Sequence, residues 1–201
     1  NIAPKHHLRG YARFIDNHRI QAEDKIYEAK SVVIATGSSP KIMSMFDGIG
    51  ERLVVNDDIF EWETLPESVA VFGPGVIGLE LGQALHRLGV RVRVFGLSGS
   101  IKPISDPGIR DYAETLFKDE FPLDAKANIH SIELENDKVK ISFVDRENGH
   151  EKVESFDYLL AATGRYPNVN DLGLENTELE LDSYGVPLFN STTMQCGNSS
   201  I

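Results

Sequence analysis

One stretch, VFGPGVIGLELGQALHRLGVRVRVFG from Val71 to Gly96, constrains the fold more than any other part of the chain. The apolar run at residues 69–72 predicts a buried strand. Apolar residues then recur with the spacing of one helical face, at Ile77, Leu81, Ala84, Leu85 and Leu88. A second apolar run at residues 90–95 predicts another buried strand. This order of strand, helix and strand is a βαβ unit and implies a parallel sheet.

The turn between the first strand and the helix carries the pattern G-x-G-x-x-G at Gly73, Gly75 and Gly78. In a dinucleotide-binding turn, the first glycine permits the tight turn and the second lets the backbone approach a pyrophosphate. The third lets the helix pack closely on the strand, and the helix N-terminus attracts the phosphates. The pattern therefore predicts a dinucleotide site. The alternative is a βαβ unit that keeps these glycines only for packing.

The end of the second strand usually selects the cofactor, because an acidic residue there binds the ribose 2′-OH of NAD and a nearby Arg binds the 2′-phosphate of NADP. Here the strand ends at Gly96, which has neither charge. Gly96 leaves room for a phosphate, and Ser98, Ser100 and Lys102 follow it as possible phosphate contacts. A flexible loop that discriminates poorly explains the same residues, so the cofactor is predicted as NAD or NADP.

The rest of the chain is predicted to place this α/β unit between two other segments. Residues 10–35 alternate like a small antiparallel sheet that ends in a buried strand at residues 31–35, and residues 41–66 are expected to form a linker with a short helical stretch at residues 56–62. Within the nucleotide domain, residues 67–165, a second helix is predicted at residues 107–118 with Asp106 as N-cap. A β-meander at residues 129–134, 139–144 and 152–156 and a buried strand at residues 158–163 complete it, and residues 166–201 are mostly loop.

The composition excludes several classes of partner. The 31 acidic residues outnumber the 20 basic ones and give a formal charge of −11, which disfavours nucleic acid and anionic lipid surfaces. No apolar run approaches the ~20 residues that a membrane-spanning helix needs. The one cysteine, Cys196, cannot form an internal disulfide, which fits a reducing, cytoplasmic location.

Three motifs in order, IATGSSP, GPGVIGLELGQALHRLGVRVRVF and AATGRYPNVNDLGLE, resemble the central part of the pyridine nucleotide–disulfide oxidoreductases, most closely the dihydrolipoamide dehydrogenases. The resemblance implies a Rossmann-like NAD(P) domain flanked by pieces of an FAD domain, at residues 1–40 and 166–201. It also implies a homodimeric parent that passes electrons between the nicotinamide cofactor and a lipoyl-protein or another disulfide substrate through FAD. The redox cysteine pair and the catalytic His-Glu pair of the family are absent, so we expect a fragment that is inactive alone.

The resemblance also implies roles for individual residues. Those expected at the NAD(P) site are Gly73, Pro74, Gly75, Val76, Ile77, Gly78, Leu79, Glu80, Gly96, Ala127 and Gly164. Those expected at the FAD site are Gly10, Thr36, Gly37 and Ser38. Glu80 matches a glutamate that pairs with a lysine beside the flavin, and the alternative is an ordinary glutamate of the first helical turn.

Two other functions remain open at this point. The missing acid at Gly96 also fits an NADPH-dependent enzyme similar to glutathione reductase or mercuric reductase. A non-catalytic nucleotide-binding module that has kept the fold is the other alternative.

Overall fold

A five-stranded parallel sheet organises residues 40–165. In this computed structural model, which describes residues 7–146, 148–198 and 201, the chain divides into two compact units, Pro40–Arg165 and the pair of segments Asn1–Ser39 and Tyr166–Ile201. The sheet of the first unit has the order β5-β12-β6-β7-β8. Its strands are β5 (Leu53–Val54), β6 (Ser68–Phe72), β7 (Arg91–Phe95), β8 (Leu123–Asp124) and β12 (Tyr158–Ala161).

The order of these strands creates a switch point beside β6. The chain leaves β6 and continues to β7 on one side, whereas β12, much later in the sequence, pairs in parallel with β6 on the other side. In open α/β sheets, ligands bind outside the carboxyl ends of the strands at such a point. The topology therefore predicts a ligand site at the loops that follow β6 and β12.

Both predicted helices of this unit are confirmed. Helix α1 spans Val76–Arg87 and connects β6 to β7, and α2 spans Pro107–Glu120. The side chain of Asp106 caps α2 by accepting a hydrogen bond from the backbone amide of Ile109 at 2.9 Å. An N-cap aspartate satisfies one of the free amides of the first turn, which explains why the helix begins there.

The predicted meander is also confirmed, as an antiparallel sheet of order β11-β10-β9. Its strands are β9 (Asn128–Glu135), β10 (Lys138–Val144) and β11 (Glu151–Phe156). Asn136 and Asp137 join β9 to β10 with φ values of 51° and 61°. Positive φ at both central residues is the geometry of a tight hairpin turn whose twist matches that of the strands.

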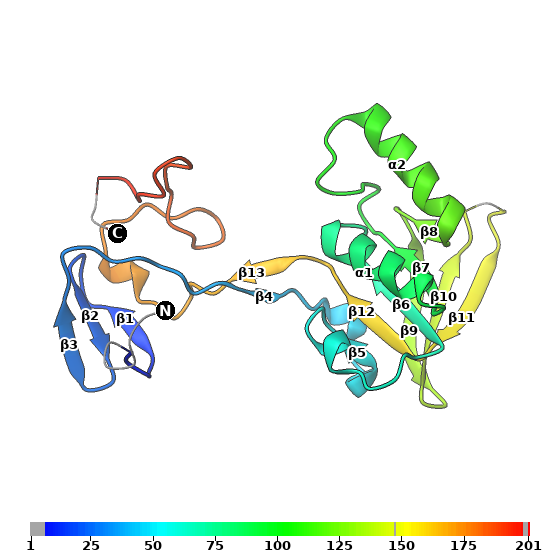
Figure 1. Ribbon diagram of the computed structural model, residues 1–201, viewed down its shortest axis with the longest axis horizontal. Coiled ribbons are helices and arrows are strands. Elements are labelled where there is room, and N and C mark those ends of the chain that lie inside the picture. The colour runs from blue at the N-terminus through cyan, green and yellow to red at the C-terminus, as the bar shows by residue number, and fades with distance from the viewer. Residues whose placement is uncertain (1–6, 147, 199–200) are drawn as a thin grey trace. The chain divides into compact units, whose positions relative to one another are not determined.

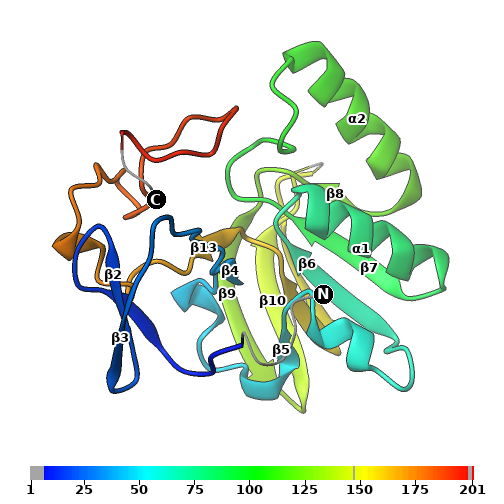
Figure 2. The same ribbon diagram turned by 60° about the vertical axis from the view of Figure 1, so that its left-hand side comes forward.

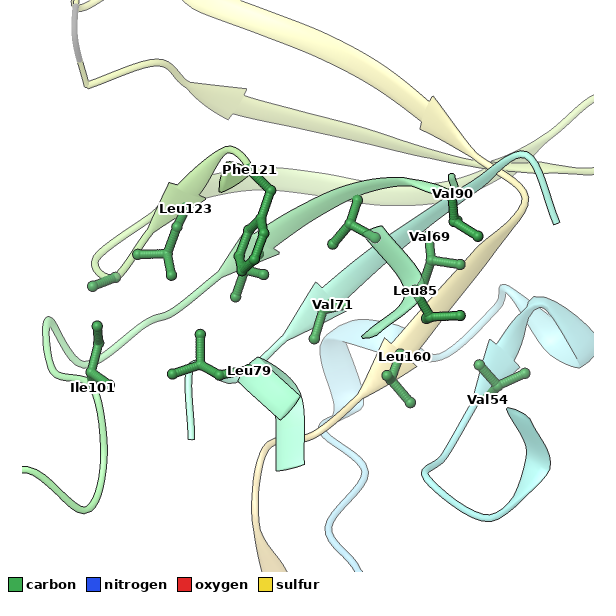
Figure 3. Close-up of a cluster of buried hydrophobic side chains, with 13 residues drawn as sticks. Val54, Val69, Val71, Leu79, Leu85, Val90, Ile101, Phe121, Leu123 and Leu160 are labelled. Carbon is green, nitrogen blue, oxygen red and sulfur yellow. The ribbon is translucent and has the colours of Figure 1, made fainter. Parts of the chain in front are cut away.

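The parallel sheet separates two hydrophobic cores because successive side chains of its strands alternate between faces. On one face, Val69, Val71, Val92 and Val94 pack with Leu79 and Leu85 of α1. Figure 3 labels Val69, Val71, Leu79 and Leu85 in this cluster. On the other face, Ala70, Phe72, Phe95, Leu159 and Ala161 pack with the meander residues Val139, Ile141, Phe143 and Phe156. The helices and the meander therefore cover opposite faces of the sheet (Figures 1 and 2).

The segment described from the sequence as a linker, residues 41–66, takes part in this packing. It contains β5 and three short 3₁₀ helices, at Ser44–Phe46, Gly50–Arg52 and Asp58–Glu61. Phe46 and Ile49 are fully buried in the core on the meander side.

The two strands β4 (Ser38–Pro40) and β13 (Arg165–Pro167) pair with each other where the chain passes between the two units.

The second unit contains the predicted small antiparallel sheet, of order β1-β2-β3, with β1 (Ala12–Phe14), β2 (Arg19–Ala22) and β3 (Lys25–Glu28). The buried strand predicted at residues 31–35 is wrong, because this segment is not a strand and Val33 is 86% exposed. No described segment pairs with it, and an apolar run becomes a buried strand only when neighbours cover both its faces. Residues 168–198 contain one 3₁₀ turn, at Leu174–Asn176, and two isolated β-bridges, Leu181 with Pro187 and Phe189 with Cys196, and are otherwise irregular, as expected.

Candidate functional site

A cavity of about 460 Å³ lies at the carboxyl ends of β6 and β12, where the topology predicts a ligand. All of its lining residues belong to the unit Pro40–Arg165. They come from the glycine turn, from the loop after β7, from the end of β12 and from the segment before β5 and just after it. These residues are Phe72–Ile77, then Leu97, Ser98, Ser100 and Lys102, then Ala161–Arg165, and Pro40, Met43 and Asn56.

Two of the three motif glycines are required by the fold itself. Gly73 has a φ of 111°, and a β-carbon there would overlap the carbonyl oxygen of Ala162. A β-carbon at Gly78 would overlap the carbonyl oxygen of Gly73 and lie 3.2 Å from the β-carbon of Ala162. The amide of Ala162 also donates to the carbonyl of Phe72 at 2.8 Å, which holds β12 against this turn. For Gly73 and Gly78, packing is therefore a sufficient explanation.

Gly75 is different, because no contact with a described residue requires a glycine there. A β-carbon at Gly75 would meet none of their atoms within 4 Å, and the backbone φ of −95° is accessible to any residue. Gly75 is the N-cap of α1, and no side chain caps the free amides that follow it. Gly75 therefore forms a cradle that a side chain would fill, which fits the close approach of a phosphate group and not packing alone.

Gly96 is a buried structural glycine. Its amide donates to the carbonyl of Asp124 at 2.7 Å, and its own carbonyl accepts from the amide of Ala127 at 2.7 Å. A β-carbon at Gly96 would lie 2.5 Å from the carbonyl oxygen of Ala125 and 2.7 Å from the ring of Pro74. The idea that Gly96 leaves room for a phosphate is therefore wrong, because protein atoms occupy that space. Gly96 itself does not line the cavity.

Only some of the residues predicted for the NAD(P) site line the cavity. Pro74, Val76, Ile77 and Gly164 line it together with Gly73 and Gly75. Gly164 has a φ of 114°, and a β-carbon there would meet no described atom within 4 Å. The cavity is therefore open beside Gly164.

The remaining predicted residues lie elsewhere. Leu79 and Ala127 are buried in the two hydrophobic cores, and neither reaches the cavity. Glu80 is exposed on α1, off the cavity, and its side chain makes no hydrogen bond or ion pair with any described residue. It lies beyond the first turn of α1, which contains no acidic residue, so the alternative of a first-turn glutamate does not hold. The role beside a flavin stays a prediction.

The charge of the cavity lining is opposite to that of the whole chain. Lys102 and Arg165 line the cavity, and none of its lining residues is acidic, although the chain has a formal charge of −11. Arg165 donates a hydrogen bond to the side-chain oxygen of Asn56 at 3.1 Å. A cavity with cations, free helix amides and no carboxylate attracts an anionic ligand.

Sequence reasoning did not identify Asn56, Met43 or Pro40 as site residues. Met43 and Asn56 belong to the segment that the sequence described as a linker, whose short strand and 3₁₀ helices bring them to the cavity, and Pro40 ends the segment before it, in β4. The polar Asn56, which directly follows an apolar run that ends at Val55, was the one available signal.

The residues expected at a flavin lie in the other unit. Thr36 and Gly37 line a separate cavity of about 660 Å³, whereas Gly10 and Ser38 do not. Asn168 holds this loop, because its backbone amide donates to the carbonyl of Gly37 at 3.0 Å and its side chain donates to that of Thr36 at 3.1 Å. The described residues of this unit contain no glycine turn followed by an α-helix, so they do not form a complete dinucleotide cradle.

Two further properties of the described residues bear on the chemistry. They contain no cluster of His, Cys, Asp or Glu suited to a metal ion. None of their helices combines the length and the apolar character needed to cross a membrane.

Comparisons with known proteins agree with the fold. The family described as "Pyridine nucleotide-disulphide oxidoreductase" matches residues 4–196. The chain is 29% identical to dihydrolipoyl dehydrogenase 1, mitochondrial, of Arabidopsis thaliana, over 92% of the chain and 38% of that protein. It is 33% identical to mercuric reductase of Staphylococcus aureus, over 96% of the chain and 35% of that protein.

A solved structure, the HOCl-induced flavoprotein disulfide reductase RclA from Escherichia coli, shares the fold with a TM-score of 0.74 at 22% identity. The match covers 90% of the chain and 41% of that structure. The chain thus spans between a third and a half of the length of these proteins.

Proposed function

Because the chain belongs to the pyridine nucleotide-disulphide oxidoreductase family, we propose that its unit Pro40–Arg165 binds a nicotinamide dinucleotide in the cavity at the end of β6. One observation supports this proposal above all. Gly75 is the motif glycine that the fold does not need, and it faces open space at the uncapped N-terminus of α1. A ligand with a pyrophosphate group accounts for it, whereas packing accounts only for Gly73 and Gly78.

Different residues of the cavity would contact different parts of such a ligand. The first backbone amides of α1, at Val76 and Ile77, would take the pyrophosphate, and Lys102 and Arg165 would add positive charge. Gly164 leaves space for a flat ring to approach the end of β12. The bound cofactor itself supplies hydride transfer, and the protein supplies binding and orientation.

The reaction of the whole protein is a further part of the proposal. We expect electrons to pass between the nicotinamide and a disulfide through FAD, in a homodimer, with the chain alone binding dinucleotide but not turning over substrate. Dihydrolipoyl oxidation coupled to NAD⁺ reduction is one candidate. An NADPH-dependent reductase is the other, and the absence of an acidic side chain among the described residues of the cavity lining favours it. A cytoplasmic location stays a prediction.

A matched pair of glycine variants tests the dinucleotide site. Gly75→Ala places a methyl group in the cradle at a cost in stability of at most about 1 kcal/mol, because alanine is a poorer N-cap than glycine. Gly108→Ala in α2 is the control, since it makes only an ordinary contact with Asp106 and lies off the cavity. Calorimetric titration with NADH and with NADPH, and a thermal melt, are measured for each protein.

We expect the unmodified chain and Gly108→Ala to bind at least one of the two cofactors with equal affinity, and Gly75→Ala to bind at least about tenfold more weakly, about 1.4 kcal/mol. Binding of neither cofactor by the folded chain would overturn the proposal. So would unchanged affinity in Gly75→Ala.

A further inference from the structure

We propose that this site selects the 2′-phosphorylated cofactor, NADP(H), and that the loop after β7, through Lys102 with Ser98 and Ser100, makes the selection. The inference rests on the proposed function, because it assumes that the adenosine half of a dinucleotide lies beside the end of β7. It assigns a cofactor preference to a site whose strand end has neither of the charged residues that usually decide it.

The first step is that selection for NAD by an acidic residue is sterically closed at the strand end. A side chain at Gly96 would meet the backbone carbonyl of Ala125 at 2.5 Å, and backbone cannot rotate away as a flexible side chain can. The hydrogen bonds of Gly96 to Asp124 and Ala127 tie the same residue to the segment that follows β8. Position 96 therefore carries no carboxylate, and none of the described residues that line the cavity is acidic.

The second step is that the loop after Gly96 is held in place and faces the cavity. The amide of Gly99 donates to the carbonyl of Ala125 at 2.8 Å, and the amide of Lys102 donates to the carbonyl of Pro74 at 3.3 Å. These bonds attach the loop to both the β8 side and the glycine turn. Ser98, Ser100 and Lys102 all line the cavity.

The third step is that these side chains have unused capacity for an anion. The hydroxyl oxygens of Ser98 and Ser100 lie 3.1 Å apart, so their mutual hydrogen bond uses one hydroxyl proton and leaves the other. Lys102 is exposed and makes no ion pair or side-chain hydrogen bond with any described residue. An ammonium group and a free hydroxyl are suitable donors for a phosphate monoester, which NADP carries and NAD lacks.

The test compares cofactors and two lysines of one region. The full 201-residue chain is titrated calorimetrically with NADPH, NADH, adenosine 2′,5′-bisphosphate and 5′-AMP at the same low salt concentration. The variant is Lys102→Met, and Lys126→Met is the control, because Lys126 lies against Gly99 but does not line the cavity. Thermal melts verify that both variants are folded.

We expect NADPH to bind at least about tenfold more tightly than NADH, and the bisphosphate more tightly than 5′-AMP by a similar factor, about 1.4 kcal/mol. Lys102→Met should weaken NADPH binding much more than NADH binding and so remove most of this preference, whereas Lys126→Met should keep it. Added salt should reduce the preference, because it screens an exposed charge pair.

The failures of the two proposals are distinguishable. Binding of NADH as tight as NADPH, or a preference that survives Lys102→Met, overturns the inference while leaving the dinucleotide site intact. Absence of binding by all four ligands overturns the proposed function itself.

Discussion

The carboxylate of Asp157 accepts hydrogen bonds from both the backbone amide and the hydroxyl of Ser68, at 2.8 and 3.2 Å. In return, the amide of Asp157 donates to the carbonyl and the hydroxyl of Ser68, both at 3.1 Å. Ser68 begins β6, and Asp157 directly precedes β12. The two residues therefore join the amino ends of the two strands, whereas the candidate site lies at the carboxyl ends.

Asp157→Ala should destabilise the protein without weakening cofactor binding. The buried amide of Ser68 would lose its acceptor, and a buried donor left unpaired costs about 1–3 kcal/mol. Asp119→Ala, on the exposed surface of α2 where Asp119 makes no contact of this kind, serves as the control and should be neutral. Urea unfolding measures the free energies, and calorimetry measures the binding. Equal stability of the two variants would contradict this role for Asp157.

The same carboxylate should make stability dependent on pH in the acid range. Burial raises the pKa of Asp157, but hydrogen bonds from Lys138 and Ser68 lower it by more than burial raises it. The pKa therefore lies below the ordinary value of 3.8. A folded pKa below the unfolded one stabilises the fold when the pH is above the unfolded value, and this contribution disappears as the pH falls through the folded one. The difference in unfolding free energy between the unmodified chain and Asp157→Asn should therefore be constant near neutral pH and shrink below about pH 4. A difference that stayed constant down to about pH 2 would show that the charge is not involved.

Gly96→Ala should destabilise the protein by about 1–3 kcal/mol, the usual cost of forcing a methyl group into a filled site. Gly82→Ala is the matched comparison, because its β-carbon would lie 3.5 Å or more from Val94, Val71 and Val92, at ordinary contact distance. Alanine also favours the interior of α1 by up to about 1 kcal/mol. Gly82→Ala should therefore be neutral or stabilising in urea unfolding. The steric account of Gly96 fails if Gly96→Ala is as stable as Gly82→Ala.

Arg93 and Glu154 should respond very differently to neutralisation. Glu154 makes ion pairs with Arg91, Arg93 and Lys152 at 3.0–3.3 Å, and its side chain is 16% exposed. Arg93 lies over the ring of Phe143, and its buried Nε has no hydrogen-bond partner among the described residues.

Arg93→Met removes that unpaired group, leaves Glu154 with two cations and should not lower the unfolding free energy. Glu154→Gln deprives three cations of their carboxylate and should cost about 1–3 kcal/mol. Chemical unfolding of both variants decides the matter, and a larger loss for Arg93→Met than for Glu154→Gln would contradict the expected order.

The predictable part of the fold was the part encoded in short-range patterns. The apolar run of β6, the helical spacing of α1 and the N-cap at Asp106 all reflect interactions within a few residues, and the elements begin and end near their predicted bounds. β5 was missed, because a strand of two residues exists only through its pairing with β12. The apolar run at residues 31–35 was misjudged for the opposite reason, since its pattern is that of a strand but no described segment pairs with it.

By itself, the sequence determined that the chain contains a βαβ unit with a glycine turn before its helix, because periodicity and glycine spacing act locally along the chain. Only the tertiary structure decided what each glycine is for. A β-carbon at Gly73 or Gly96 would overlap the carbonyl of Ala162 or Ala125, which directly follow β12 and β8. A β-carbon at Gly75 would contact no described residue. Contacts between residues far apart in sequence leave no periodic signal, and for that reason the packing glycines and the ligand glycine look alike until the chain is folded.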